Sequence, residues 1–166
     1  LFISIHCNAN ANTAAFGAET YLMGLHKTDA NLDVSKRENA VITLEKDYKN
    51  QYDGFDPHAP ETHIILSLNQ NAHIEQSTLL AGFIQKQFKE LGRYSRGVKQ
   101  AGFLVLYKTA MPAVLIETGF LTNPSEGSYL ISDEGQSKLS SSIFKGFKSY
   151  KDVMEGNSSE MAEIPK

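Results

Sequence analysis

Cysteine is almost missing from this sequence, in which Cys7 is the only one among 166 residues. A single cysteine excludes an internal disulfide and a zinc site built from several cysteines. No hydrophobic run approaches the roughly 20 residues of a membrane-spanning helix, so we predict no transmembrane segment. Positive charge is not in excess either: 16 Lys and Arg stand against 19 Asp and Glu, and the formal net charge is −3. We therefore expect neither nucleic acid nor an anionic lipid surface as a partner.

The composition that remains is that of an ordinary globular protein, with 41% hydrophobic and 21% charged residues. A chain of 166 residues is long enough for one domain with a sizeable core. The first residue is Leu1 and not a methionine. We therefore expect a fragment whose natural N-terminus, together with any signal peptide, lies upstream.

Strand-like and helix-like patterns alternate along the chain. Short apolar segments rich in β-branched and aromatic residues predict strands at 1–6, 17–23, 103–108 and 112–118. Helical spacing and capping residues predict helices at 76–91, which Gly92 ends, after Asn123-Pro124 and after Asp133. This alternation predicts an α/β fold, with a twisted, mainly parallel sheet flanked by helices.

Residues 31–75 do not fit the alternation, and we interpret them as a helical insertion. A helical pattern that Asp33 can cap comes first, with apolar residues at Val34, Val41, Leu44 and Tyr48. A turn-rich loop with Gly54, Pro57 and Pro60 follows, and then an apolar stretch at 63–68 that we expect to be helical. The domain is expected to cover 1–151, and the polar residues 152–166 to form a tail or linker.

Two side chains suited to catalysis stand where predicted buried strands end. His6 closes the first apolar run, and Glu117 closes the run that begins at Pro112. In open α/β sheets, ligands bind outside the carboxyl ends of the strands. A neutral imidazole binds zinc and a carboxylate accepts a proton from bound water, so the pair suits zinc hydrolysis. Two plainer interpretations stay open: a hydrogen-bonded loop histidine, and a glutamate that caps a turn or pairs with a lysine.

Four segments of the sequence resemble one known family. They are "SIHCNAN", "GAETYLM", "RGVKQAGFLVLYKTAMPAVLIETGFLTNPSE" and "GQSKLSSSIFKGFKSY". In order and spacing they are similar to the zinc-dependent N-acetylmuramoyl-L-alanine amidases, bacterial enzymes that cut the bond between the lactyl group of the glycan and the stem peptide. The resemblance covers residues 1–150 apart from the insertion. It implies a peptidoglycan hydrolase of the periplasm or the extracellular cell envelope, with Zn²⁺ as its cofactor.

The resemblance also implies roles for two residues. His6 matches the histidine of the family's Ser-Ile-His-Ala-Asn motif, which is a zinc ligand, and Cys7 replaces the small alanine after it. Glu117 matches the catalytic acid/base, which takes a proton from the zinc-bound water and passes it to the leaving alanine nitrogen. The family's two further zinc ligands lie N-terminal to this strand and have no counterpart in this sequence. We therefore expect the chain by itself to be inactive.

Two more positions match the family, and each has two interpretations. Asn8 falls on the asparagine of the same motif, where it supports the site or faces the substrate, or else caps a loop. Arg96 belongs to the matching Arg-Gly-Val segment. It can bind a carboxylate of the stem peptide through a two-pronged contact, or it can form a surface salt bridge.

The insertion suggests a partner. Some members of the family carry a helical segment here that covers the zinc cleft until an activator protein displaces it, and Glu38 and Glu45 are acidic residues able to approach a metal. The alternative is a segment that only packs on the surface.

Two rival functions stay open as well. One is a non-catalytic cell-wall-binding or regulatory domain derived from such an enzyme, and the presence of both His6 and Glu117 argues against it. The other is a related zinc exopeptidase that acts on free peptides. The segment "IETGFLTN" argues against that second rival.

Overall fold

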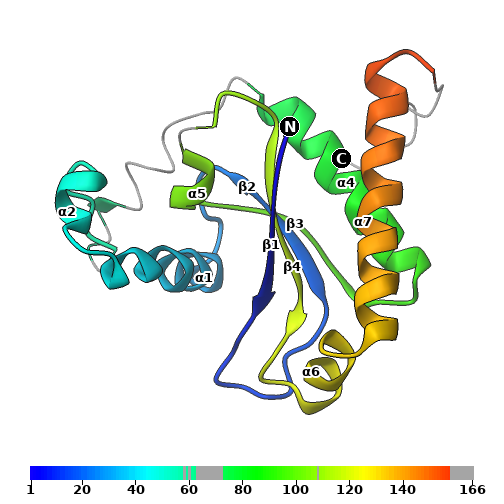
Figure 1. The fold of residues 1–166 in the computed structure, drawn as a ribbon, viewed down its shortest axis with the longest axis horizontal. Coiled ribbons are helices and arrows are strands. Elements are labelled where there is room, and N and C mark those ends of the chain that lie inside the picture. The colour runs from blue at the N-terminus through cyan, green and yellow to red at the C-terminus, as the bar shows by residue number, and fades with distance from the viewer. Residues whose placement is uncertain (58, 60, 63–72, 108, 158–166) are drawn as a thin grey trace.

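The core of the computed structural model, which describes residues 1–57, 59, 61–62, 73–107 and 109–157, is a four-stranded sheet. Its strands are β1 (Phe2–Asn8), β2 (Ala18–Met23), β3 (Ser95–Ala101) and β4 (Ala113–Phe120), in the order β1-β4-β2-β3 (Figure 1). β1 pairs with β4 and β2 pairs with β3 in parallel, whereas β2 and β4 are antiparallel. Two of the three pairings are parallel, so the predicted α/β fold with a mainly parallel sheet is confirmed.

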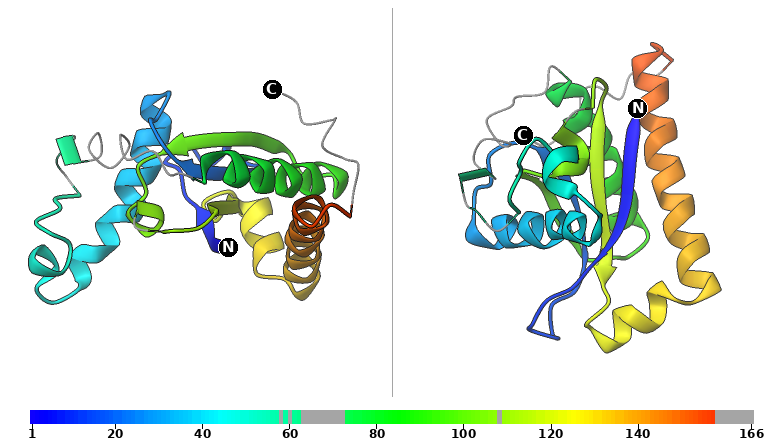
Figure 2. Two further views of the ribbon diagram at one scale, coloured as in Figure 1. Left: turned by 90° about the horizontal axis from the view of Figure 1, so that it is seen from above. Right: turned by 60° about the vertical axis from the view of Figure 1, so that its left-hand side comes forward.

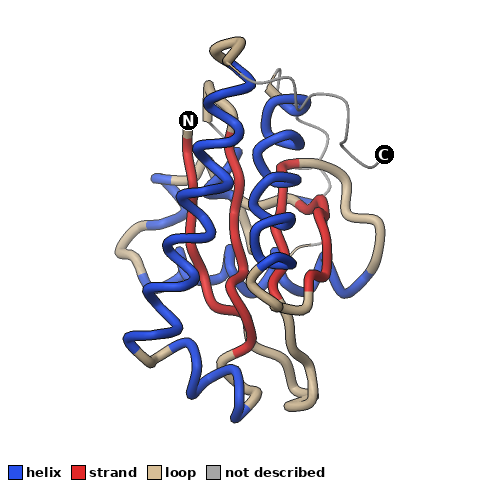
Figure 3. Tube along the Cα trace, turned by 90° about the vertical axis from the view of Figure 1, so that its right-hand side faces the viewer, coloured by secondary structure: helices blue, strands red, loops and turns tan. Residues whose placement is uncertain are grey.

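Two long helices, α4 (Ile74–Glu90) and α7 (Asp133–Met154), cover one face of this sheet (Figure 3). Gly146 lets them approach closely, because a Cβ there would lie 2.9 Å from the Cα of Ile84. The core on this face includes Leu80, Ile84, Phe88, Val114, Ile116 and Ile143. The shorter α6 (Pro124–Leu130) has Asn123 as its N-cap, as predicted. None of the described helices combines the length and the apolar character that crossing a membrane requires.

The helices of the insertion lie on the other side of the strands from α7 (Figure 2). They are α1 (Asp29–Asn39), the 3₁₀ helix η1 (Ala40–Leu44) and α2 (Tyr48–Gln51), and the short α5 (Leu104–Tyr107) joins them. A second core fills this side, with Tyr21, Met23, Ile42, Phe55, Phe103, Leu106 and Leu115. Successive residues of β2 and β4 face the two cores alternately, which is why both strands are buried along their whole length.

One strand was placed wrongly from the sequence. Of the predicted strand at 103–108, residues 104–107 form the helix α5, and the true strand β3 lies just upstream. The segment is apolar because it packs on the second core, in which Phe103 and Leu106 are buried and Leu104 and Tyr107 are partly buried. β3 is an edge strand with polar side chains, so it has no apolar run that would reveal it.

The insertion is helical, but its boundaries differ from those predicted. α1 begins at Asp29, and its cap is Thr28, whose side chain accepts a hydrogen bond from the backbone N–H of Asn31. The helix then tightens into η1, which leaves Val41 and Leu44 exposed. The expected helix at 63–68 lies outside the described residues. α7 continues past residue 152, where the polar tail was expected to begin, and 158–166 lie outside the described residues.

Candidate active site

The polar residues at the ends of β1 and β4 form a row across the sheet. In the strand register His6 lies opposite Glu117, and Glu117 lies opposite Glu19 of β2. Residues opposite each other in a sheet point to the same face. On that face the neighbouring Leu115 and Tyr21 belong to the second apolar core. The row therefore begins where this core ends, at the carboxyl ends of two parallel strands.

Glu38 of α1 reaches this row from the insertion. One of its carboxylate oxygens lies 2.7 Å from Nδ1 of His6, and the other lies 3.6 Å from Nε of Arg37. The hydrogen bond to Glu38 raises the pKa of His6, against the opposing effect of burial. Burial alone would raise the pKa of Glu38, but the hydrogen bond and charge of His6, together with Arg37, lower it. Both shifts favour a charged pair.

Glu117 is fully buried, and neither of its carboxylate oxygens has a hydrogen-bond partner among the described residues. Burial, followed by the negative charge of Glu38, raises the pKa of Glu117 to about 8. A buried carboxylate without a partner is costly in its charged form. The group is therefore poised to hold a proton, or to be stabilised by a cation.

A metal ion fits the chemistry of this cluster. His6, Glu38 and Glu117 each offer one ligand atom, and these atoms lie within 4.8 Å of one another. One imidazole and two carboxylates are a ligand set that suits zinc and other divalent transition metals. The two unpartnered oxygens of Glu117 are the buried polar atoms that a cation would satisfy. The cluster is therefore a candidate metal site.

The row continues beyond Glu117 to a second polar centre, built on Glu19. The Glu19 carboxylate accepts hydrogen bonds from Nδ2 of Asn8 at 2.8 Å, the hydroxyl of Tyr21 at 2.9 Å and Nε of Arg96 at 2.9 Å, and it also accepts one from Nζ of Lys99. Burial alone would raise the pKa of Glu19, but Lys99 and Arg96 lower it. Burial and the nearby Glu19 charge raise the pKa of Tyr21, which therefore stays a donor. Glu19 is thus a charged, fully paired carboxylate.

Asn8 and Arg96 take part in this second centre. Asn8 is buried, and its side-chain oxygen accepts hydrogen bonds from the backbone N–H of Ala9 at 2.8 Å and from Nη2 of Arg37 at 2.6 Å. It therefore both caps its loop and connects α1 to Glu19. Arg96 forms its salt bridge with a buried carboxylate and not with a surface one, and its Nη1 also donates to the carbonyl of Phe16 at 3.3 Å.

Sequence reasoning missed Glu19 and Lys99. The available signal was a carboxylate inside the apolar segment "GAETYLM", because all six residues of β2 are buried and a buried carboxylate needs partners. Glu45, unlike Glu38, does not join the metal cluster of the described residues. Its carboxylate accepts a hydrogen bond from the hydroxyl of Tyr52 at 2.9 Å.

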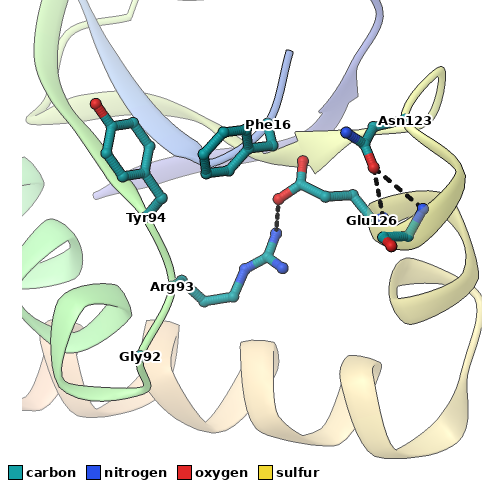
Figure 4. Close-up of a pocket in the computed structure, with 7 residues that line it drawn as sticks. Phe16, Gly92, Arg93, Tyr94, Asn123 and Glu126 are labelled. Atoms are coloured by element: carbon teal, nitrogen blue, oxygen red, sulfur yellow. Dashed lines mark hydrogen bonds and ion pairs between the residues drawn. The ribbon is translucent and has the colours of Figure 1, made fainter. Parts of the chain in front are cut away.

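A cavity of about 370 Å³ lies between the start of β3 and α6 (Figure 4). Its lining residues are Phe16, Gly92, Arg93, Tyr94, Asn123, Ser125 and Glu126. Arg93 and Glu126 form an ion pair of 2.6 Å there, and Glu126 also accepts hydrogen bonds from the backbone N–H groups of Gly17 and Phe120. These contacts hold the loops that follow β1 and β4. No member of the metal cluster lines the cavity.

Comparisons with known proteins show which family the sequence of this chain matches. The family model of N-acetylmuramoyl-L-alanine amidase matches residues 1–149. The N-acetylmuramoyl-L-alanine amidase AmiA of Escherichia coli K12 is 30% identical over 159 residues, which cover 90% of this chain and 51% of that protein. The chain thus spans about half the length of the curated relatives it matches.

Solved structures agree with this likeness. The N-acetylmuramoyl-L-alanine amidase of Clostridium difficile 630 has a TM-score of 0.56 and 27% identity, over 90% of this chain and 56% of that one. The amidase Ami1 of Mycobacterium smegmatis has a TM-score of 0.60 over 91% of this chain and 53% of that one, and at 16% identity it shows the shared fold alone. A family match over residues 1–149 covers nearly the whole sequence, and the chain belongs to the N-acetylmuramoyl-L-alanine amidase family.

Proposed function

We propose that this chain forms part of a peptidoglycan amidase, which hydrolyses the amide bond between N-acetylmuramic acid and the L-alanine of the stem peptide. The observation that carries the proposal is the buried, unpartnered carboxylate of Glu117, which lies beside His6 at the ends of two parallel strands. Membership of the amidase family supports the same reaction. Peptidoglycan as the substrate puts the site of action in the bacterial cell envelope, in the periplasm or outside the cell.

The proposed mechanism gives Glu117 the proton transfers. The imidazole of His6 would hold a zinc ion in part, and such an ion would polarise the amide carbonyl and lower the pKa of a water. Glu117 takes the proton of the attacking water and passes it to the leaving nitrogen of L-alanine. Pairing of β4 with strands on both sides fixes the backbone of Glu117, so the carboxylate does not have to be ordered during the reaction. A pKa raised by burial suits a group that must hold a proton between two steps.

Glu38 has a different role in this proposal. Its contact with Nδ1 of His6, at 2.7 Å, occupies the imidazole that we assign to the metal. We infer that α1 holds the enzyme in a low-activity state and that a protein activator acts on the insertion. A complex of a relative with a second protein is known, since the CwlD amidase of Clostridioides difficile has been solved with the GerS lipoprotein.

The test is digestion of purified sacculi by the full-length protein, combined with its zinc content. An amidase releases stem peptides with a free N-terminal L-alanine and leaves uncut glycan strands, which mass spectrometry distinguishes from the products of other wall hydrolases. Binding to sacculi without release would support the non-catalytic rival. Hydrolysis of free peptides with intact sacculi would support the exopeptidase. Either result would overturn the proposal.

A further inference from the structure

The polar row crosses all four strands, and its charge changes along the way. It starts with His6 on β1, passes Glu117 on β4 and Glu19 on β2, and ends with two cations of β3, Arg96 and Lys99. Lys99 lies opposite Tyr21 in the β2–β3 register, and therefore on the same face as the rest of the row. The row thus has a metal-binding end at β1 and a cationic end at β3.

Positive charge is in excess at the β3 end. One carboxylate, Glu19, faces both Arg96 and Lys99. Its side chain is 2% exposed, whereas those of Arg96 and Lys99 are 34% and 22% exposed. The anion therefore lies beneath, and the two cations lie above it toward solvent. A buried carboxylate that carries four hydrogen bonds is a rigid anchor for the groups that bind to it.

Both cations keep donors for a further anion. Arg96 uses Nε for Glu19 and Nη1 for the carbonyl of Phe16, and its Nη2 has no hydrogen bond to any described residue. The ammonium of Lys99 carries three N–H donors and makes one hydrogen bond, to Glu19, while lying 5.8 Å from the centre of the Tyr21 ring. A guanidinium and an ammonium side by side, fixed from below, suit a carboxylate ligand.

We propose that Lys99 and Arg96, positioned by Glu19, bind a carboxylate of the stem peptide, so that the peptide runs from Glu117 toward β3 and the glycan lies toward β1. This inference rests on the proposed function. The lactyl carboxyl of N-acetylmuramic acid is consumed in the amide bond, and the sugars carry no other charge, so every free carboxylate of the substrate is on its peptide side. The cationic end of the row therefore fixes the direction of the substrate across the sheet.

Two matched substrates test the inference in the full-length enzyme: a soluble muropeptide with free peptide carboxylates, and the same muropeptide with carboxamides in their place. Wild-type enzyme should have a KM for the free-carboxylate form that is lower by about tenfold, the usual scale for one hydrogen bond between charged groups. Lys99→Gln should remove most of this difference by raising the KM for the free-carboxylate form. Lys99→Arg should restore the preference. Lys145→Gln, on the exposed surface of α7, is the matched control and should behave as wild type.

Glu19→Gln tests the positioning role, because it keeps the size of the side chain and removes the charge that holds the two cations. The preference for the free-carboxylate form should fall at least about threefold, with kcat less affected than KM. If Glu19→Gln fails to fold, Lys99→Gln decides, because Lys99 is partly exposed. Equal KM values for both substrates in the wild type, or an equal rise for both in Lys99→Gln, would overturn the inference while the amidase function stands. A wild type that hydrolyses neither substrate would overturn the proposed function itself.

Discussion

Nδ1 of His6 and Oε2 of Glu38 lie 2.7 Å apart, although 32 positions of sequence separate the two residues. The contact joins the end of β1 to the C-terminal end of α1. It also brings an acidic side chain of the insertion to the imidazole that we assign to the metal. Activity, metal binding and the position of α1 should therefore depend on one another, and this dependence can be measured.

Replacing Glu38 should test whether α1 restrains the enzyme. Glu38→Gln removes the charge that holds His6, so basal sacculus digestion by the full-length protein should rise, by about tenfold if the contact contributes one charge-assisted hydrogen bond. Glu45→Gln is the matched control, since Glu45 contacts Tyr52 and not the cluster. Unchanged or lower activity in Glu38→Gln would rule out restraint by this contact. Deleting residues 33–60 also removes the contact, but it takes Ile42 and Phe55 out of the second core. A change in activity could then come from a loss of folding stability.

Replacing Glu117 should separate catalysis from folding. Glu117→Gln keeps the size of the side chain, and loss of a general acid/base typically lowers the rate roughly 10²–10⁴-fold. Zinc content and the circular dichroism spectrum of the full-length variant should stay close to those of the wild type. Glu90→Gln, at the exposed end of α4, provides the control. Near-normal sacculus digestion by Glu117→Gln would remove Glu117 from the mechanism.

The stability of the metal-free protein should fall as pH rises from 4.5 to about 8. In this window folded Glu117, with its pKa raised to about 8, keeps a proton that the unfolded chain has released. The folded state therefore binds more protons, and the free energy of unfolding decreases with pH. His6 acts in the same direction, because its raised pKa gives stability that is full below 6.5 and is lost as pH rises through the folded value.

Glu117→Gln should flatten this pH dependence, because glutamine has no proton to release. With a chelator present, the drop in Tm between pH 5.5 and 8.5 should be smaller in the variant than in the wild type by about 4 °C or more. The dependence of Tm on pH that remains in the variant comes from His6, whose pKa is raised. The lowered pKa of Glu38 affects stability only below this pH window. Identical slopes in variant and wild type would mean that Glu117 is not perturbed in solution.

The 166-residue chain by itself should carry no stoichiometric zinc and show no amidase activity. A catalytic zinc site needs three protein ligands and an open position, and here Glu117 is assigned to proton transfer while Glu38 is bound to His6. Elemental analysis of the purified chain provides the measurement. One tightly held zinc per chain would show that Glu38 completes the site, in which case Glu38→Gln should release the metal.

The same chain should self-associate through β1. This strand is an edge of the described sheet, and its Ile5 is 60% exposed. Exposed edges pair readily with other chains. Light scattering after size-exclusion chromatography should show a mass that rises with concentration, and Ile5→Lys should lower it. A strictly monomeric chain at high concentration would contradict this expectation.

That His6 and Glu117 lie side by side could be predicted from the sequence, because each follows a local apolar run and parallel strands bring their carboxyl ends together. Glu19 could not, because its charge is balanced by Arg96 and Lys99, which lie 77 and 80 positions away. β3 was not predicted for a similar reason. It is a polar edge strand without an apolar run, and its strand conformation depends on pairing with β2. Local patterns thus predicted the elements with apolar faces, whereas contacts distant in sequence decided the rest.

The pairing of β1 with β4 also determines when the site can form during synthesis. Thr118 donates a hydrogen bond to the carbonyl of His6 across 112 positions of sequence. Contacts of such long range close late in folding, because a long loop must be ordered before they form. During translation the strand of His6 leaves the ribosome long before its neighbour exists. The pairing that places His6 beside Glu117 therefore arises only after β4 has been synthesised.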